Sequence, residues 1–407
     1  MHSRNWWRNW RRTDMGVRDW LRGSGNVETP AYYFDLDVFA HRVDFACREL
    51  KGLPLTFSMK ANPFLVAYLP ENIRHVEVCS PGELMICKAN HIPGSRIIYS
   101  GVNKGSADLS EAIAYDVDIA TAESIRQVEL EQTAAKQLGK VQKVLLRLTS
   151  GNQFGMSEGD IAHIISNAAR YPNLHIYGIH YYSGTQKKLR HVEKDIKILE
   201  QCLIKLKEEM NFTPQFVEIG PGASVDHFDP AYDLEEELFH QMAGLLVNFA
   251  EKYPLGIELG RFLAAPCGSY ATKVADLKNS CDTDYVICDG GIHQLRYHGQ
   301  TMAMQIPEME LISANKNDVQ KLYCICGSLC TVADVLVREV ELPEITIGDT
   351  LLFHQCGAYS VTEGSALFLS RELPAVYVYS KKNGLQKKRD VIEVASMNGY
   401  NSCFSSR

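Results

Sequence analysis

The sequence predicts an α/β fold: a (β/α)8 barrel of the TIM type, followed by a second, mostly β C-terminal domain. Two observations carry this prediction. From about residue 55, short β-branched or apolar runs alternate with longer amphipathic stretches, and eight such runs precede residue 260. After about residue 268, strand-like runs continue without long helical stretches between them, which is typical of an all-β domain.

The eight runs have the spacing of strand–helix units. They cover residues 55–59, 76–79, 97–100, 118–120, 144–149, 176–181, 216–219 and 255–259. Stretches with helical periodicity lie between several of them, at residues 82–89, 124–138, 161–169, 191–208 and 234–250. Their charged residues fall opposite the Leu and Ile stripes, as in helices that pack on a sheet. Eight such units imply a closed barrel.

The second domain is predicted from five further strand-like runs, at residues 269–276, 285–288, 322–325, 350–353 and 375–379. Residues 30–34 are also strand-like and precede a long helical stretch, so we expect them to join this domain. The expected organisation is an N-terminal arm (1–28), a joining strand (29–36), a barrel (37–267) and a β domain (268–407).

Composition narrows the function class. The formal net charge of −7 gives no general attraction to nucleic acid or anionic lipid, and no apolar run approaches the roughly 20 residues that span a bilayer. The 12 Cys residues lack the paired spacing of a zinc site or a secreted disulfide scaffold. We expect reduced cysteines, no metal site and a cytoplasmic location.

The N-terminal arm differs from the rest of the chain. All four Trp residues lie within it, among six Arg residues, at Trp6, Trp7, Trp10, Trp20, Arg4, Arg8, Arg11, Arg12, Arg18 and Arg22. It has no continuous apolar segment of a secretory signal. Two interpretations stay open: an extension without chemistry, which we favour, and a docking surface for an acidic partner.

Active sites of such barrels lie at the C-terminal ends of the strands, where Lys60 follows the first run. Its flanking residues Met59 and Ala61 are apolar, and partial burial would favour the neutral amine that a Schiff base requires. Taken alone, a lysine at a strand end is more often a solvated rim residue.

Glycine-containing turns follow the seventh and eighth runs, where barrels commonly bind phosphate. They contain Gly220 and Gly222 in one turn and Gly260 with Arg261 in the other. Glycine lets backbone N–H groups approach phosphate oxygens, and an Arg adds a bidentate charge. Glycine is common in any tight turn, so the phosphate interpretation depends on the position of both turns after the seventh and eighth strands.

These segments together resemble the fold-type III pyridoxal-5′-phosphate (PLP) decarboxylases, the group of diaminopimelate, ornithine and arginine decarboxylases that shares its barrel with alanine racemase. The resemblance runs from about residue 30 to 380. It implies that Lys60 is the Schiff-base lysine, that Glu258 pairs with the pyridine nitrogen, and that Gly220, Gly222, Gly260 and Arg261 hold the phosphate. Gly357-Ala358-Tyr359 resembles a family segment whose Tyr reaches the phosphate and lines the substrate site.

Two further segments bear on the reaction. Residues 327–334 resemble a loop that the decarboxylases place across a dimer interface, which implies that Cys330 is the proton donor and that the protein is a homodimer. Without the resemblance, Cys330 is simply another buried thiol. Residues 178–186 resemble a segment that implies His180 as an acid or base, although a buried structural His fits this position equally well.

The sequence departs from the family pattern at three places. Tyr182 stands where the family has a ring-stacking His, and Thr185 where it has a phosphate-binding Ser; both changes preserve the chemistry. Thr331 replaces an acidic residue that contacts the distal amino group of the substrate. A basic distal group would lose its ion-pair partner there. Because of Thr331, we keep two hypotheses for the substrate: a simple amino acid, and an acidic or carrier-tethered amino acid.

Four further positions are candidates. Arg296 can face an acidic distal group, although a lone Arg is commonly a surface residue. Asp334 lies in the Cys330 loop and is a candidate substrate contact, and Glu83 resembles a family carboxylate near the cofactor, although a Glu at a helix start is as good an account. The resulting interpretation is PLP-dependent decarboxylation of an amino acid. A PLP-dependent racemase and a catalytically silent regulatory protein are the alternatives.

Overall fold

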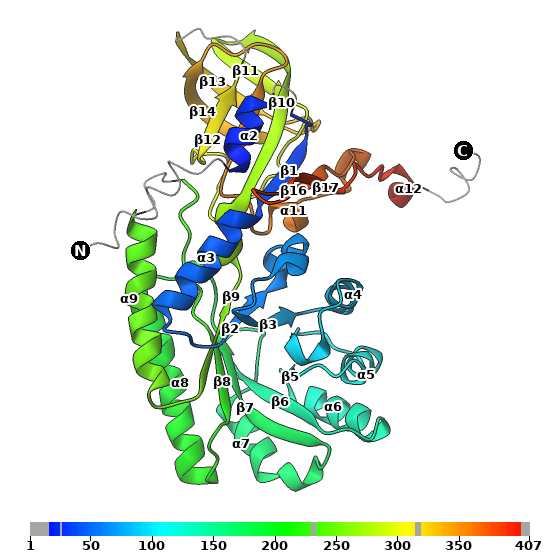
Figure 1. Ribbon diagram of the computed structural model, residues 1–407, viewed down its shortest axis with the longest axis vertical. Coiled ribbons are helices and arrows are strands. Elements are labelled where there is room, and N and C mark those ends of the chain that lie inside the picture. Colours follow the sequence, from blue (N-terminus) through cyan, green and yellow to red (C-terminus); the bar gives the residue numbers. More distant parts are fainter. Residues whose placement is uncertain (1–15, 25–26, 229–232, 314–318, 400–407) are drawn as a thin grey trace. The chain divides into compact units, whose positions relative to one another are not determined.

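The computed structural model describes residues 16–24, 27–228, 233–313 and 319–399, which form two compact units (Figure 1). Residues 42–225 and 233–263 make up the barrel unit. Residues 16–41, 226–228 and 264–399, apart from the gaps just named, make up the β unit. Helix α3 (Leu36–Glu49) contributes residues to both.

The barrel unit confirms the predicted fold class. In the described part of the chain, eight parallel strands close into a barrel in sequence order, because β2 pairs with both β3 and β9. Each strand corresponds to one of the eight predicted runs: β2 (Leu55–Ser58), β3 (Ile73–Val78), β4 (Ile97–Tyr99), β5 (Ile119–Ala122), β6 (Gln142–Leu148), β7 (Leu174–Tyr182), β8 (Phe216–Gly220) and β9 (Leu255–Leu259). Their side chains are mostly buried on both faces, as expected for strands covered by helices.

Helices follow the strands and lie outside them (Figure 1). They are α4 (Pro81–Ala89), α5 (Ser106–Ala114), α6 (Ile125–Gln137), α7 (Glu158–Ser166), α8 (Leu189–Met210), α9 (Asp233–Ala250) and α10 (Arg261–Ala264). Ser80, Ser124 and Ser157 begin three of them, because each side-chain oxygen accepts an N-terminal backbone N–H. Among the described residues, no helix has the length and apolarity needed to cross a membrane.

The first strand–helix repeat of the barrel differs from the other repeats. After β2 the chain forms two short 3-10 helices, η1 (Met59–Ala61) and η2 (Pro63–Tyr68), instead of one long helix. Asn62 begins the second of these, since its side chain accepts the N–H of Phe64 at 3.0 Å. Lys60 is therefore held in a tight turn at the C-terminal end of its strand.

The β unit is built on a nine-stranded sheet. It contains β1 (Ala31–Asp35), β10 (Gly268–Ser280), β11 (Thr283–Cys288), β12 (Met309–Ile312), β13 (Gln320–Cys326), β14 (Val335–Pro343), β15 (Thr350–Phe353), β16 (Ala375–Ser380) and β17 (Gly384–Arg389). Strand β1 lies between β10 and β16, antiparallel to the first and parallel to the second. Sequence analysis missed β12, β14 and β17, which are partly exposed; in β14 charged residues interrupt the apolar run, and β17 is mostly polar.

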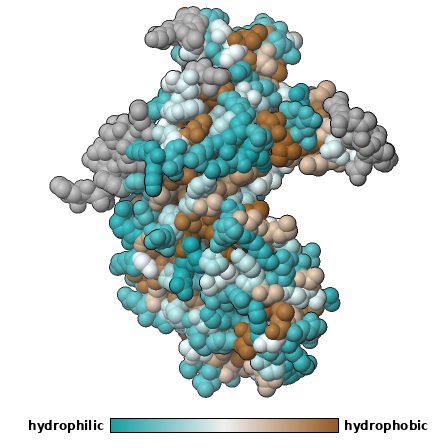
Figure 2. Space-filling view, turned by 45° about the vertical axis from the view of Figure 1, so that its right-hand side comes forward, coloured by the Kyte–Doolittle hydropathy of each residue, from teal (hydrophilic) through white to brown (hydrophobic). Residues whose placement is uncertain are grey.

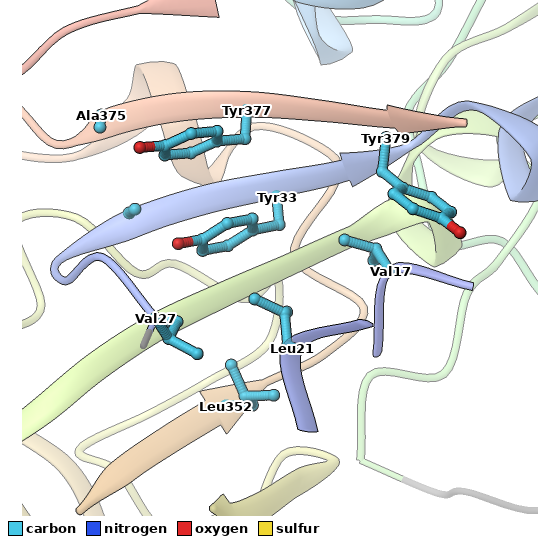
Figure 3. Packing of buried hydrophobic residues seen from close by; sticks show 10 residues of the cluster. Val17, Leu21, Val27, Tyr33, Leu352, Ala375, Tyr377 and Tyr379 are labelled. Atoms are coloured by element: carbon cyan, nitrogen blue, oxygen red, sulfur yellow. The ribbon is translucent and has the colours of Figure 1, made fainter. Parts of the chain in front are cut away.

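The described part of the N-terminal arm is a helix, α2 (Val17–Gly23), and not a free extension. Val17 and Leu21 are buried in a cluster with Tyr33, Leu352 and Tyr377 (Figure 3). Two ion pairs, Arg18–Glu308 and Arg22–Glu310, each have an N–O distance of 2.6 Å. The arm's remaining named residues, Arg4, Trp6, Trp7, Arg8, Trp10, Arg11 and Arg12, lie outside the described residues.

Helix α6 buries a carboxyl group that the fold does not pair. Glu131 is completely buried, and neither of its side-chain oxygens has a hydrogen-bond partner among the described residues. Burial raises the pKa of Glu131 to about 7, with the charge of Lys104 opposing the shift. The folded state therefore binds more protons than the unfolded state between the usual carboxyl pKa and pH 7, and stability falls as pH rises through this window.

We expect Glu131→Leu to raise the unfolding temperature, by more at pH 8.5 than at pH 5.5. The gain in the free energy of unfolding at high pH is about 3 kcal/mol, because burial raises the pKa of Glu131 from 4.5 to about 7. Thermal unfolding followed by circular dichroism at both pH values measures it. The matched control is Glu129→Leu, two residues earlier on the exposed side of the helix. An equal gain at both pH values, or none, would contradict the ionisation argument.

Candidate active site

Lys60 faces two carboxylates that come from the neighbouring barrel strands. Its Nζ lies 2.6 Å from Oε2 of Glu77 on β3 and 3.4 Å from Oε1 of Glu258 on β9. The Sγ of Cys79 is 3.7 Å away. Because barrel closure places β2 between β3 and β9, these groups meet at one end of the barrel. Sequence analysis missed Glu77; the only local signal was a carboxylate inside an apolar strand.

Glu258 is held in its ionised form. Its carboxylate is almost fully buried, which favours the neutral acid, yet Lys60 and His180 hold the pKa of Glu258 well below its usual range. The Nε2 of His180 lies 3.2 Å from Oε2, and the Ser58 hydroxyl donates to Oε1. His180 is itself buried, and its Nδ1 has no hydrogen-bond partner among the described residues. The barrel end thus holds a buried anion surrounded by donors.

The pKa of a second carboxyl group, Glu218 on β8, is shifted in the opposite direction. Glu218 is 1 % exposed, and burial raises its pKa well above the usual range, with the nearby charge of Glu258 adding to the effect. The Thr56 hydroxyl donates to its Oε1 at 2.7 Å. Two carboxyl groups on adjacent strands therefore have pKa values driven apart, a pattern that marks functional sites more often than structural ones.

The aromatic ring of Tyr182 lies against a glycine. β7 ends at Tyr182 and β8 at Gly220, and the two residues are paired across the sheet. A Cβ on Gly220 would be 2.5 Å from a ring carbon, so only glycine fits under the ring. The Nζ of Lys60 is 6.0 Å from the ring centroid. Tyr182 thus lies near Lys60 and packs against Gly220.

The turn after β8 is packed against the turn after β7. Gly222 has φ of +65°, and a Cβ there would lie 2.2 Å from the carbonyl oxygen of Gly184. Gln186 accepts the N–H of Val225 and donates to its carbonyl, at 2.6 and 2.7 Å. Nε of Arg261 donates to the Thr185 hydroxyl at 3.4 Å. Glycine backbone, a hydroxyl and a guanidinium therefore converge, which is the chemistry that a phosphate requires.

Glu83 and Gly260 have local roles. The Glu83 carboxylate accepts the backbone N–H of Cys79 at 2.6 Å at the start of α4, which favours the helix-start interpretation over a cofactor contact. Burial raises the pKa of Glu83, and this hydrogen bond opposes the rise. A Cβ on Gly260 would lie 3.0 Å from Cβ of Ser58, so this glycine lets the turn after β9 approach β2.

In the β unit, Asp334 organises the loop that carries Cys330. Its two carboxylate oxygens accept the N–H groups of Ile292 at 2.8 Å and Leu329 at 2.7 Å, and the residue is 3 % exposed. Both carboxylate oxygens of Asp334 thus hold backbone amides inside the β unit, and its contact with substrate stays a prediction. Cys330 is exposed, contrary to the buried-thiol interpretation, and Val332 in the same loop is fully exposed. Thr331 between them is partly exposed.

Arg296 and Tyr359 lie on segments that are tied together. The Ser360 hydroxyl donates to the carbonyl of Arg296 at 2.6 Å and accepts its N–H at 3.3 Å. Tyr359 has a left-handed backbone, with φ of +68°, which is uncommon for a residue other than glycine. The Arg296 side chain is exposed. The predicted residues thus form one group in the barrel unit, around Lys60, and further groups in the β unit, around Asp334 and Ser360.

Among the described residues, no three His, Cys, Asp or Glu side chains gather in a way that could hold a metal ion. The groups that converge at the barrel end suit an organic phosphate instead. Lysine, a buried carboxylate, an aromatic face and a glycine-lined turn with Thr185 and Arg261 fit PLP: they offer an amine for its aldehyde, an anion for its ring nitrogen and donors for its phosphate.

Comparison with known proteins identifies relatives of the whole chain. The family model described as "Pyridoxal-dependent decarboxylase, C-terminal sheet domain" matches residues 76–357. The chain is 26 % identical over 373 residues to 2-[(L-alanin-3-ylcarbamoyl)methyl]-2-hydroxybutanedioate decarboxylase of Staphylococcus aureus, covering 84 % of this chain and 92 % of the relative. It is 26 % identical over 389 residues to L-glutamyl-[BtrI acyl-carrier protein] decarboxylase of Niallia circulans, covering 88 % and 90 %.

Diaminopimelate decarboxylase of Bacteroides thetaiotaomicron is 24 % identical over 376 residues, covering 86 % of this chain and 95 % of the relative. Among solved structures, diaminopimelate decarboxylase from M. jannaschii matches with a TM-score of 0.79 at 22 % identity, covering 90 % of this chain and 91 % of that one. Lysine/ornithine decarboxylase from Vibrio vulnificus, complexed with cadaverine, matches with a TM-score of 0.77 at 18 % identity, covering 90 % and 98 %. These two likenesses support the fold.

Proposed function

The chain belongs to the pyridoxal-dependent decarboxylase family and is a PLP-dependent amino-acid decarboxylase; we propose that Lys60 binds the cofactor and that Cys330 acts as proton donor at a homodimer interface. The observation that carries the proposal is the position of Lys60, whose Nζ lies between the carboxylates of Glu77 and Glu258 at the C-terminal end of the barrel strands.

The chemistry that PLP supplies is the withdrawal of electrons from the Cα–carboxylate bond of the substrate. Lys60 would provide the amine that holds the cofactor covalently. Glu258, kept ionised by its neighbours, holds a proton at the pyridine nitrogen. His180 orients Glu258 through its 3.2 Å contact, which we favour over a direct acid–base role. Tyr182 would pack against the cofactor ring and exclude water from that side.

The phosphate is held by the backbone of Gly220 and Gly222, by Thr185, and by Arg261 after Gly260. These groups already form hydrogen bonds to one another or lie in one turn system, so binding needs little rearrangement. Cys330 would donate the proton that Cα of the substrate needs. The relatives named as decarboxylases favour this reaction over the racemase alternative.

The homodimer proposal rests on exposed apolar groups. In the β unit, large apolar side chains are at least 44 % exposed at Met302, Met304, Ile306, Val332, Leu367, Phe368 and Leu369. On the face shown in Figure 2, hydrophobic patches occur on both units within a mostly hydrophilic surface. An exposed Cys330 beside a fully exposed Val332 fits a loop that a second copy covers. The described cysteines are all free thiols, which fits the proposed cytoplasmic location.

We propose a substrate whose distal end carries no free ammonium. Thr331 offers no carboxylate to such a group, and Arg296 presents an exposed guanidinium that suits an acidic one. Two relatives act, by their names, on an amino acid joined through a carbamoyl group to a hydroxybutanedioate and on a glutamyl group attached to a carrier protein. A conjugated or carrier-tethered amino acid fits both observations better than lysine or diaminopimelate.

The test is an absorbance spectrum of the purified protein followed by a CO2-release panel. The panel includes lysine, ornithine, meso-diaminopimelate, glutamate, and diamino acids acylated on the distal amine, each in both hands. We expect the acylated or acidic compounds to be used best. Thr331→Glu should shift the preference toward lysine by about tenfold, the scale of one charge-assisted hydrogen bond.

The matched control is Thr331→Gln, which has the size of the Glu variant without its charge. Equal preference in the Glu and Gln variants would show that Thr331 does not face the distal group. Best turnover of free lysine by the wild type would refute the proposed substrate class and leave the decarboxylase assignment intact. Bound cofactor without CO2 from any compound would favour the silent regulatory alternative.

A further inference from the structure

Lys187 is a buried lysine close to the proposed cofactor site. It follows β7 by five residues and is 7 % exposed, whereas the next residue, Lys188, is exposed. Lysine is seldom buried unless its ammonium is paired. Its Nζ lies 2.5 Å from Oδ2 of Asp195 on α8, a residue that is also 7 % exposed. The barrel unit therefore encloses an ion pair that the proposed mechanism does not use.

Asp195 binds several side chains from the end of β7 and the segment that follows it. Besides Lys187, its carboxylate accepts the Ser183 hydroxyl at 2.8 Å and the Tyr181 hydroxyl at 3.3 Å. Tyr181 and Ser183 flank Tyr182 on either side. Three donors from positions 181, 183 and 187 therefore converge on one carboxylate, which fixes the backbone that carries the Tyr182 ring.

Lys187 also contacts the two features proposed to hold the cofactor. Its backbone N–H donates to the carbonyl of Gly222 at 2.9 Å. Its Cε would be 3.2 Å from a Cβ on Gly222, so the side chain lies directly beside the glycine turn. Its Nζ is 5.8 Å from the centroid of the Tyr182 ring, close to the 6.0 Å of Lys60. The ring thus has two ammonium groups within cation–π range.

We propose that Lys187, paired with Asp195, is a positioning residue for the decarboxylase: it fixes the ring of Tyr182 and the glycine turn at Gly222 in the arrangement that binds pyridoxal phosphate. This inference rests on the proposed function. A lysine that served only to fill space would need neither the ion pair nor the backbone contact with the turn. Burial lowers the pKa of Lys187 and Asp195 opposes the shift, so separating the pair leaves an unfavourable buried charge.

The experiment measures cofactor binding to the apoprotein, independently of turnover. Lys187→Met keeps the length and apolar stem of the side chain and removes the charge. We expect the dissociation constant for pyridoxal phosphate to rise at least about tenfold, since a lost cation–π contact and a broken buried pair each carry energy on this scale. Lys188→Met is the matched control, because it removes the same charge from the exposed neighbouring position.

A double variant guards against misfolding. Lys187→Met combined with Asp195→Leu removes both charges, so no carboxylate is left buried alone. We expect it to fold and to bind the cofactor as weakly as Lys187→Met, with the absorbance band of bound cofactor altered. The unfolding temperature of each apoprotein shows whether binding was measured on folded protein.

The outcomes separate this inference from the proposed function. A wild type that binds no pyridoxal phosphate overturns the proposed function and this inference with it. If the wild type binds and the folded double variant binds within about twofold of it, only the positioning role of Lys187 is overturned. A lower unfolding temperature with an unchanged dissociation constant also overturns it, because that pattern describes a purely structural ion pair.

Discussion

Replacing Lys60 with alanine is expected to abolish the absorbance band of covalently bound cofactor and to lower CO2 release by on the order of 10³-fold or more, the scale of losing a covalent catalyst. Lys60 is the amine that converges with Glu77 and Glu258 at the barrel end. The spectrum of the purified variant, together with release of labelled CO2, measures both effects. Lys136→Ala, at an exposed position on α6, is the control and should match the wild type.

The same variant tests the shared site. Inactive Lys60→Ala and inactive Cys330→Ala proteins, mixed under conditions that exchange subunits, should recover part of the wild-type activity. Recovery is expected because a mixed dimer pairs one intact lysine with one intact cysteine from the other copy. If subunit exchange is demonstrated and activity stays at the level of the separate variants, the interface role of Cys330 is wrong. An unchanged absorbance band in Lys60→Ala would instead remove the cofactor assignment of Lys60.

Glu258→Gln is expected to lower kcat by about 10²–10³-fold while the cofactor still binds, because the loss resembles that of removing one preorganised electrostatic contact. Glutamine keeps the shape but has no negative charge with which to hold a proton at the pyridine nitrogen. In the wild type this charge is secured by Lys60 and His180, which keep the pKa of Glu258 well below its usual range. Steady-state kinetics at saturating cofactor separate this loss from weaker cofactor binding.

Glu218→Gln is the matched control for this prediction. Burial raises the pKa of Glu218 well above its usual range, which favours its neutral form, and a glutamine can still accept the hydrogen bond of Thr56. We expect its kcat within a few-fold of the wild type. Similar large losses in both variants would mean that burial of a carboxyl group, and not the charge of Glu258, matters at this end of the barrel.

Local sequence was sufficient for the architecture of the barrel. Each barrel strand is a short apolar run followed by a turn residue, and Lys60, Gly220 and Gly260 stand where those runs end. The predictions succeeded because strand burial and turn chemistry depend on residues close together in the chain. Strands β12, β14 and β17 were missed because β12 is short, charged residues interrupt β14, and β17 is mostly polar, so that pairing with neighbouring strands defines them.

The family resemblance added residue roles that local pattern could not supply, and the structure shows internal contacts for two of these residues that the sequence did not indicate. Asp334 is expected to contact substrate, and in the structure its oxygens accept the N–H of Leu329 in its own loop and that of Ile292 in another segment. The Glu83 carboxylate accepts a hydrogen bond from the backbone N–H of Cys79. A motif records which residue type stands at a position, whereas the atoms that the side chain contacts depend on how the loop folds around it.

The sequence by itself thus determined that the chain forms a barrel with a β domain, and where along the chain the reactive lysine and the glycine turns lie. Only the tertiary structure decided which charges face Lys60. Glu258 is 198 residues away in sequence and comes within 3.4 Å because β2 and β9 close the barrel. The pairing of Lys187 with Asp195 likewise requires α8 to fold back beside the turn after β7. Electrostatic partners are chosen by distance in space, and a linear pattern does not contain that distance.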